Sequence, residues 1–227
     1  FLKKNSEQLA MNGVFYPLAE GKNHHNALAL PVCGAKPPRY LMHRYGNDVE
    51  KNLQAFHTYF DEIEEKIRKV DPETVILTSE FLGREFKPEL GQPLFDRLNA
   101  LFDSISVVVY FRSPASYYLS AALQTLKASG ILKHPTKQVA RKILQSYDPL
   151  GADMIVREYK REALVNGDVC EDFISVVAPD LVGKLPAPSR EQNQTLSAEV
   201  MSIIQDYRNA IWPNDNNQFN EETNGLL

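Results

Sequence analysis

Residues 107–120, with the sequence VVVYFRSPASYYLS, join an apolar run to a segment with helical character. The run from Ile105 to Phe111 is rich in β-branched and aromatic residues, which is typical of a strand buried in a parallel sheet. Arg112 stands at the exit of this run, and Pro114 opens a predicted helix that ends near Ala128. The sequence therefore predicts a buried strand, an arginine at its carboxyl end and a helix directly after it.

Strands and helices alternate along the rest of the chain. The predicted strands are Val14–Tyr16, Val75–Thr78 and Met154–Arg157, and the predicted helices cover about 1–12, 49–70, 93–102, 169–177 and 196–211. Residues 19–39 are rich in Gly, Pro, Asn and His and predict a loop. This alternation indicates an α/β domain with a largely parallel sheet. Such sheets bind ligands beyond the carboxyl ends of their strands, which singles out Ser79, Glu80 and Arg112.

The composition indicates an ordinary soluble protein. The chain has 227 residues, which fits one large domain, and its net charge of −4 argues against a general nucleic-acid binder. Cys33 and Cys170 lack CxxC spacing, so we expect free thiols in a reducing, cytoplasmic compartment. The chain has no run of about 18 apolar residues, so we expect no membrane span. Residues 214–227 are polar and Asn-rich, and we expect a mobile tail; the oligomeric state stays open.

Arg112 and Ser120 have side chains suited to a phosphate group. A guanidinium offers a planar fork of donors that matches phosphate oxygens, and a serine hydroxyl adds a further hydrogen bond. The start of the intervening helix contributes free backbone N–H groups and a favourable dipole. An isolated pair with this spacing is usually a surface arginine and a packed serine, but the buried strand in front of Arg112 favours a phosphate site.

On these residues the chain resembles sulfotransferases that use 3′-phosphoadenosine-5′-phosphosulfate (PAPS), in particular bacterial, carbohydrate-sulfotransferase-like members. Those enzymes bind the 3′-phosphate with an arginine at a strand end and a serine eight residues later, which implies that Arg112 and Ser120 bind the nucleotide. The segments 1–17, 124–130, 155–173 and 193–197 are also similar to members of that family. The resemblance implies a three-layer, P-loop NTPase-like fold with a central, mostly parallel sheet flanked by helices. The implied activity is sulfuryl transfer from PAPS to a hydroxyl of a carbohydrate or small-molecule acceptor, without a metal.

One part of the family pattern is not present in this sequence. The family holds the phosphosulfate with a loop of glycine, threonine and lysine between the first strand and the first helix. Lys3 and Lys4 lie too far into the first predicted helix to replace that lysine. We therefore expect the first strand and its loop to belong to the native protein but to lie outside this chain. The junction of Leu150 and Gly151 similarly lacks helical residues that the family usually has.

The sulfuryl acceptor needs a base, and three residues are candidates. Glu80 follows a predicted strand, where burial would tune its carboxylate toward proton uptake. His24 and His25 lie in the loop after an earlier strand, and histidine titrates near neutral pH. The alternative readings are a helix-capping partner for Glu80 and an exposed or metal-binding pair for the two histidines. Tyr40, Tyr45 and Trp212 offer rings for stacking on a sugar.

Two other functions fit the same residues. The first is a non-catalytic relative that binds a nucleotide or a glycan, which the missing phosphosulfate loop favours. The second is a P-loop kinase for a small molecule, which would need the same loop and an acidic Mg²⁺ ligand that the sequence does not single out.

Overall fold

The computed structural model describes residues 1–227 except 20–21, 23, 128, 133–139, 187–196 and 214–227. The chain divides into two compact units: unit 1 comprises Phe1–Phe111 and Val139–Ala187, and unit 2 comprises Arg112–Gln138 and Pro188–Leu227. The sequence predicts one domain, and this stays a prediction. Unit 1 contains two clusters of buried apolar residues and unit 2 contains one among the described residues. The predicted tail and most of the similar segment 193–197 lie outside the described residues.

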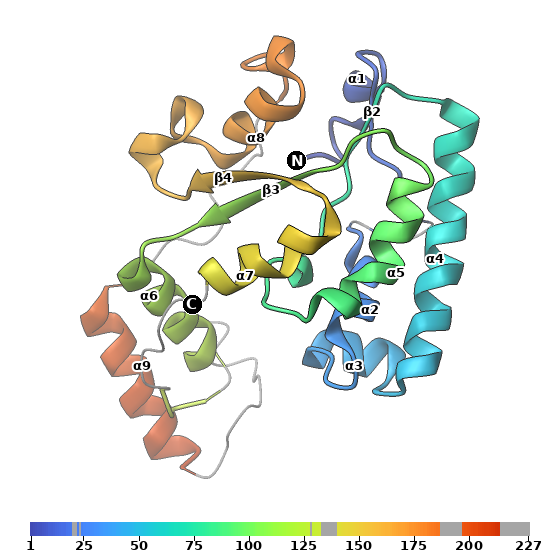
Figure 1. The fold of residues 1–227 in the computed structure, drawn as a ribbon. Helices are drawn as coiled ribbons and strands as arrows, with labels where there is room; N and C mark the ends of the chain where they lie inside the picture. The colour runs from blue at the N-terminus through green and yellow to red at the C-terminus, as the bar shows by residue number, and fades with distance from the viewer. Residues whose placement is uncertain (20–21, 23, 128, 133–139, 187–196, 214–227) are drawn as a thin grey trace. The chain divides into compact units, whose positions relative to one another are not determined.

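Unit 1 is a mixed α/β structure (Figure 1). Its strands are β1 (Val14–Phe15), β2 (Thr74–Val75), β3 (Ser106–Phe111) and β4 (Asp153–Glu158). Its α-helices are α1 (Ser6–Ala10), α2 (Leu30–Cys33), α3 (Arg39–Tyr45), α4 (Val49–Val70), α5 (Pro88–Asn99), α7 (Ala140–Tyr147) and α8 (Val169–Val177). Short 3₁₀ turns are η1 (Asn26–Ala29), η2 (Glu80–Leu82), η3 (Asp148–Leu150), η4 (Arg161–Ala163), η5 (Val165–Gly167) and η6 (Pro179–Leu181). The predicted α/β class is confirmed.

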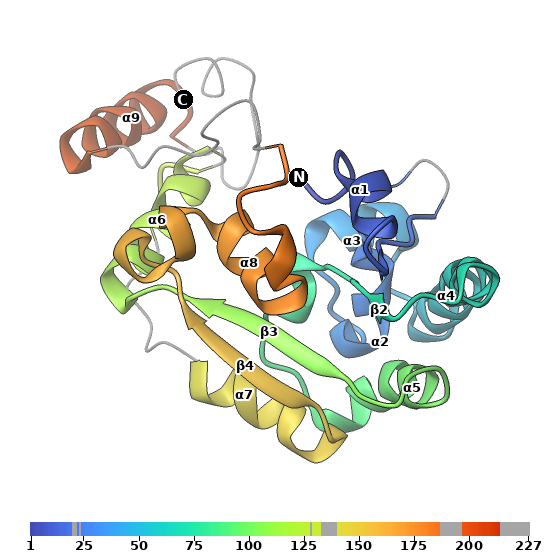
Figure 2. The same cartoon turned by 90° about the horizontal axis from the view of Figure 1, so that it is seen from above.

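The strands of unit 1 form two small sheets, and both pairings are parallel. β1 pairs with β2, and β3 pairs with β4 in a register that runs from Ser106 opposite Asp153 to Phe111 opposite Glu158. β3 lies between β4 and β2 in Figure 2. The strand predicted at residues 105–111 is therefore confirmed, whereas Val75–Thr78 contributes only its first residue to a strand and continues as extended chain toward η2.

Helix α4 has the length that its sequence predicts. The Asp48 carboxylate caps the helix by accepting the Lys51 N–H at 3.0 Å, which satisfies one of the free N–H groups of the first turn. The helix ends at Asp71, which adopts a left-handed conformation with φ of 49° before Pro72. Its buried residues recur at helical spacing: Phe56, Tyr59, Phe60, Ile63 and Ile67. One face of α4 therefore packs into the hydrophobic core.

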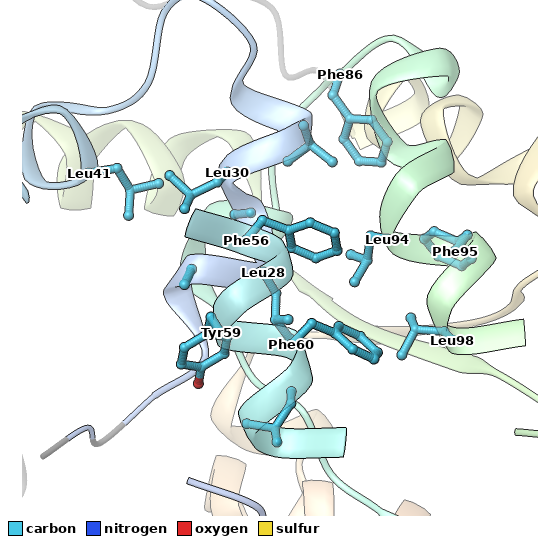
Figure 3. Close-up of a cluster of buried hydrophobic side chains, with 14 of the residues drawn as sticks. Leu28, Leu30, Leu41, Phe56, Tyr59, Phe60, Phe86, Leu94, Phe95 and Leu98 are labelled. Atoms are coloured by element: carbon cyan, nitrogen blue, oxygen red, sulfur yellow. The ribbon is translucent and has the colours of Figure 1, made fainter. Parts of the chain in front are cut away.

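The main core of unit 1 packs α4 against α2 and α5 (Figure 3). Its members come from η1, α2, α3, α4, α5 and the segment before α5: Leu28, Leu30, Leu41, Phe56, Phe60, Phe86, Leu94, Phe95 and Leu98. Tyr147 on α7 also belongs to this core, and its ring meets the Phe86 ring edge-on with 5.0 Å between the ring centroids. Gly91 is needed here because a Cβ would lie 2.7 Å from the Phe86 ring. Removing one of these buried rings would leave a cavity, which typically costs about 3–5 kcal/mol.

The predicted loop at residues 19–39 is wrong in its central part. Asn26 to Val32 are buried and form η1 and α2. The Ala27-Leu28-Ala29-Leu30 sequence supplies apolar side chains to the core, and this burial overrides the loop preference of the surrounding Gly, Pro and His residues. Helix α5 also starts earlier than predicted, at Pro88, with Pro93 inside it.

The carboxylate of Asp172 joins four elements of unit 1. It is fully buried and accepts hydrogen bonds from the Tyr110 hydroxyl on β3 at 2.8 Å and from the Val165 N–H on η5 at 3.0 Å. Arg157, on β4, also donates from Nε to one oxygen of the carboxylate and from Nη2 to the other. These donors lower the pKa of Asp172 to about 2, and the hydrogen bonds from Arg157 make the largest contribution. A buried carboxylate with this many partners locks β3, β4 and α8 together.

Unit 2 is a helical pair in which α6 (Pro114–Leu126) packs against α9 (Ala198–Ile211). The cluster between them consists of Ala122, Leu126, Met201 and Ile204. Ser113 and Ser197 cap the two helices through their hydroxyl oxygens. A Cβ at Gly130 would lie 2.1 Å from the Asn209 side-chain oxygen, so a larger residue there would require the Asn209 side chain to move. The helices predicted at 114–128 and 196–211 are confirmed to within two residues.

We predict that Asp172→Asn destabilises unit 1 by about 3 kcal/mol at pH 7, because it breaks a buried ion pair. Folding lowers the pKa of this carboxyl to about 2, so its contribution is complete above about pH 4 and is lost as the pH falls toward 2. Urea unfolding from pH 7 to pH 3 measures this effect. The control Glu85→Gln, which removes an exposed ion pair with Lys142, should change stability by about 0.5 kcal/mol or less. Equal effects of the two variants would contradict the prediction.

Candidate functional site

His25 is buried at the carboxyl ends of β1 and β2. Its side chain has no exposed surface, and both ring nitrogens lie at hydrogen-bond distance from the backbone. Nδ1 accepts the Thr78 N–H at 3.0 Å, and Nε2 lies 2.5 Å from the Pro17 carbonyl oxygen. The His25 N–H also donates to the Thr78 carbonyl at 2.9 Å. One imidazole thus connects the segment after β1 to the segment after β2.

This geometry fixes the protonation of His25. Because Nδ1 accepts a backbone N–H, the single proton of the neutral ring must lie on Nε2, which donates it to Pro17. Burial lowers the pKa of His25 to about 4. The ring therefore stays neutral near pH 7, and neither nitrogen is open to a substrate proton. His25 is positioned as a structural bridge rather than as the base that the sequence proposed.

His24 has the same tautomer but lies nearer to solvent. The Asn26 N–H donates to His24 Nδ1 at 3.3 Å, and the Tyr40 hydroxyl lies 3.3 Å from Nε2. Since Nδ1 accepts, the neutral ring carries its proton on Nε2 and donates it to the Tyr40 oxygen. The Tyr40 ring meets the imidazole edge-on at 5.9 Å between centroids. His24 therefore orients Tyr40 and holds its own ring nitrogens in hydrogen bonds.

Glu80 lies at the start of η2 and is exposed. The burial that the sequence predicts for it is absent, because the chain leaves β2 as a surface turn capped by Ser79, whose hydroxyl accepts the Phe81 N–H at 3.3 Å. The Ser79 hydroxyl also donates to the Asn26 side-chain oxygen at 3.0 Å. An exposed carboxylate is open to a ligand, so Glu80 is the one of the three candidates whose functional atoms are accessible.

A recess in unit 1 lies beside these residues. It is lined by Lys22, His24, Asn26, Ala27, Tyr40, Leu41, Arg44, Tyr45 and Tyr59. The Tyr59 hydroxyl donates to the His24 carbonyl at 3.4 Å, which attaches the loop to α4. Burial raises the pKa of Tyr59 far above its ordinary value, so its hydroxyl stays protonated at neutral pH. The recess combines two cationic side chains, three tyrosines and several hydrogen-bonding groups.

Both neighbours of Glu80 contact residues that line this recess. Ser79 donates to Asn26, and the Phe81 ring stacks on Tyr40 at 6.0 Å with an interplanar angle of 23°. The backbone on both sides of Glu80 therefore lies near the recess, although Glu80 itself does not line it. His24 and the two predicted stacking residues Tyr40 and Tyr45 line the same recess in unit 1.

Arg112 and Ser120 belong to unit 2. Arg112 directly follows β3 in the chain and precedes Ser113, whose hydroxyl accepts the Ser116 N–H at 3.3 Å and caps α6. Ser120 lies in the second turn of α6 and is half-buried, as Arg112 is. The local strand–arginine–helix order is the one that the sequence predicts. Trp212, at the end of α9, packs against Tyr207 and Arg208.

Sequence reasoning did not single out Lys22, Asn26, Arg44 and Tyr59 as site residues. Lys22, Asn26 and Arg44 had no sequence signal other than proximity to His24 or Tyr40. Tyr59 was read only as part of the apolar pattern of α4. No group of three or more His, Cys, Asp or Glu residues is arranged for a metal ion within the described ranges. Within the same ranges, no helix has the length and apolar character needed to cross a membrane.

Comparison with known proteins gave no match: no protein-family model, curated protein sequence or solved structure is significantly similar to this chain. The function must therefore be argued from its own residues.

We predict that the His25 imidazole titrates near pH 4 and carries its proton on Nε2 above that pH. The unfolded chain binds the proton near the ordinary value of 6.5, so the folded state loses stability as the pH falls from 6.5 toward 4, by about 3 kcal/mol in total. NMR correlation of the ring nitrogens and carbons measures both the tautomer and the titration. Titration of His25 near 6.5, or a proton on Nδ1 at pH 7, would rule out the bridge.

Proposed function

We propose that this chain is the larger part of a sulfotransferase that moves the sulfuryl group of PAPS to a carbohydrate hydroxyl. The observation that carries the proposal is the order of β3, Arg112 and α6. Arg112 directly precedes a capped helix N-terminus, and Ser120 follows in the second turn of that helix. A guanidinium, a hydroxyl and the free N–H groups of a helix start are a suitable donor set for a phosphate. We assign the nucleotide 3′-phosphate to them.

The proposed reaction is a direct transfer. The acceptor oxygen forms a bond to sulfur while the bond from sulfur to the 5′-phosphate oxygen breaks, and the products are a sulfate ester and adenosine 3′,5′-bisphosphate. A base removes the proton of the acceptor hydroxyl. We assign this step to Glu80, because it is exposed, whereas the ring nitrogens of His24 and His25 are engaged in hydrogen bonds.

The packing of unit 1 supports the central sheet of the proposed fold. Leu77 after β2 and Val107 on β3 both pack against the main core, which lies around α2, α4 and α5. On the opposite side, Ile76 belongs to the cluster of Ile174 on α8, and Tyr110 on β3 donates to Asp172 on the same helix. The two small sheets thus have the same helices on their two faces, as two parts of one layer would.

The hydrogen-bond register indicates where that layer is interrupted. Asp153 donates to the Ile105 carbonyl and Tyr159 to the Phe111 carbonyl, so the odd-numbered residues of β3 face β4 in the parallel ladder. Val108 and its even-numbered neighbours direct their backbone groups to the other edge, on the side toward β2 in Figure 2. We propose that one further parallel strand, the first strand expected from the resemblance, joins β2 to β3. A parallel sheet covered on both faces normally continues in this way.

We predict that the full-length native protein binds adenosine 3′,5′-bisphosphate and that Arg112→Ala weakens this binding by about tenfold to a hundredfold, because a charge-assisted hydrogen bond is lost. Ser120→Ala should have a smaller effect, about threefold to tenfold, because its hydroxyl is neutral. Isothermal titration calorimetry measures both. Arg141→Ala, an exposed arginine of α7 in unit 1, is the matched control and should bind normally.

The outcomes separate the candidate functions. Binding that depends on Arg112, together with sulfation of a carbohydrate that Glu80→Gln abolishes, supports the sulfotransferase. Nucleotide binding without any transfer would favour a non-catalytic relative. Preference for ATP and Mg²⁺ would favour a small-molecule kinase, and absence of any nucleotide binding would reject the proposal.

A further inference from the structure

The backbone around Glu80 is held on both sides by residues from other parts of unit 1. Before it, the Thr78 N–H donates to His25 Nδ1 at 3.0 Å, and the Thr78 carbonyl accepts the His25 N–H at 2.9 Å. After it, the Phe81 ring stacks on the ring of Tyr40. The exposed Glu80 therefore belongs to a short turn whose two ends are fixed by hydrogen bonds and packing.

Ser79 joins this turn to Asn26. Its hydroxyl oxygen accepts the Phe81 N–H at 3.3 Å, which forms a hydrogen bond across Glu80. The same hydroxyl donates its proton to the Asn26 side-chain oxygen at 3.0 Å. A serine hydroxyl has one proton and two lone pairs, so it makes both bonds at once. Asn26 therefore sets the direction of the hydroxyl that closes the turn.

Asn26 is itself held in place. It is only 6% exposed, and its backbone N–H donates to His24 Nδ1 at 3.3 Å. It directly follows His25, whose ring lies between Pro17 and Thr78. Buried hydrogen-bond networks rigidify the segments that they join. The contact between Asn26 and Ser79 thus connects the rigid, buried loop to the exposed turn.

We propose that Asn26 and Ser79 are positioning residues for Glu80, which orient the turn so that its carboxylate can take the proton of the acceptor hydroxyl. This inference rests on the proposed function, in which Glu80 is the base. Proton removal depends on the place of the base, and a misplacement of about 1 Å can lower the rate about a hundredfold. In this scheme neither side chain contacts the reacting atoms, so both affect the rate of transfer and not the binding of the nucleotide.

The first test needs no substrate and uses the ¹⁵N-labelled full-length protein. Ser79→Ala removes the hydroxyl, so the Phe81 amide should exchange with solvent about tenfold faster, as the loss of one neutral hydrogen bond implies. The NMR order parameter of the Glu80 amide should fall as well. Asn26→Ala keeps the hydroxyl but removes its acceptor, and we expect changes in the same direction with smaller size.

Two further variants are the controls for this test. Ser79→Thr keeps a hydroxyl, and the extended backbone of residue 79, with φ of −153° and ψ of 128°, suits a β-branched side chain. It should therefore restore the native exchange and order. Ser197→Ala removes a hydroxyl that caps α9 by accepting the Val200 N–H, and it should change neither quantity. Ser79 is only half-buried, so its variants keep the test valid if alanine at the buried Asn26 prevents folding.

The second test follows the release of adenosine 3′,5′-bisphosphate from PAPS, with a mixture of glucose, N-acetylglucosamine and lactose as acceptors. We expect Ser79→Ala and Asn26→Ala to lower kcat by about tenfold to a hundredfold and to leave the KM for PAPS unchanged. Ser79→Thr should retain most of the activity, and Ser197→Ala should match the native protein. A role in general stability alone would not produce this separation of kcat from KM or this rescue by threonine.

The two tests distinguish this inference from the proposed function. Native exchange at Phe81 and native order at Glu80 in both alanine variants would overturn the positioning role, whatever the activity assay gives. A raised KM for PAPS with unchanged kcat would also overturn it, because Ser79 or Asn26 would then bind the nucleotide. If the amides respond as expected but the native protein transfers no sulfuryl group, the turn is held as described and the sulfotransferase is the part that fails.

Discussion

The neutral imidazole of His25 holds the carboxyl ends of β1 and β2 together, and the recess depends on it. Its two ring nitrogens connect Pro17 to Thr78 across segments that are 61 residues apart in the chain. The residues on either side of it, His24 and Asn26, both line the recess. A charged ring at this position would lose the hydrogen bond from Thr78, since a protonated Nδ1 cannot accept. Burial that keeps His25 neutral therefore also keeps the recess in shape.

Asp172 connects the elements around the second sheet as His25 connects those of the first, but it does so in its charged form. His25 is kept neutral by burial, whereas Asp172 is kept ionised because Arg157, Tyr110 and a backbone N–H all donate to it. The two residues together hold the strand ends and the helix α8 that borders both sheets. Acidification acts on both in the same direction: it charges His25 and neutralises Asp172, and each change removes hydrogen bonds that the folded state uses.

The candidate residues for the proposed chemistry fall into two groups: some have their polar atoms occupied by structural hydrogen bonds, and others remain accessible to a ligand. Histidine is the usual first choice for a base near neutral pH, yet both histidines of this site accept backbone N–H groups and serve to orient their neighbours. Glu80 lies at a surface turn, and its neighbours Ser79 and Phe81 connect it to the recess. Position in the fold, rather than residue type, therefore separates the candidate base from the residues that support it.

The sequence by itself determined those elements in which local pattern and burial agree. The apolar spacing and the caps of α4 predict its ends at Val49 and Val70, and α8 likewise matches its predicted range Val169–Val177. The β-branched run of β3 and the order of strand, Arg112 and helix were equally predictable, because one short segment contains the whole signal.

Only the tertiary structure decided what the polar residues do. The burial of Asn26 to Val32, the tautomers of His24 and His25, the exposure of Glu80 and the meeting of Lys22, Arg44 and Tyr59 all depend on partners far away in the chain. A histidine has the same sequence signature whether its nitrogens face a substrate or a backbone carbonyl. The difference lies in desolvation and in hydrogen-bond partners, which exist only once the chain has folded.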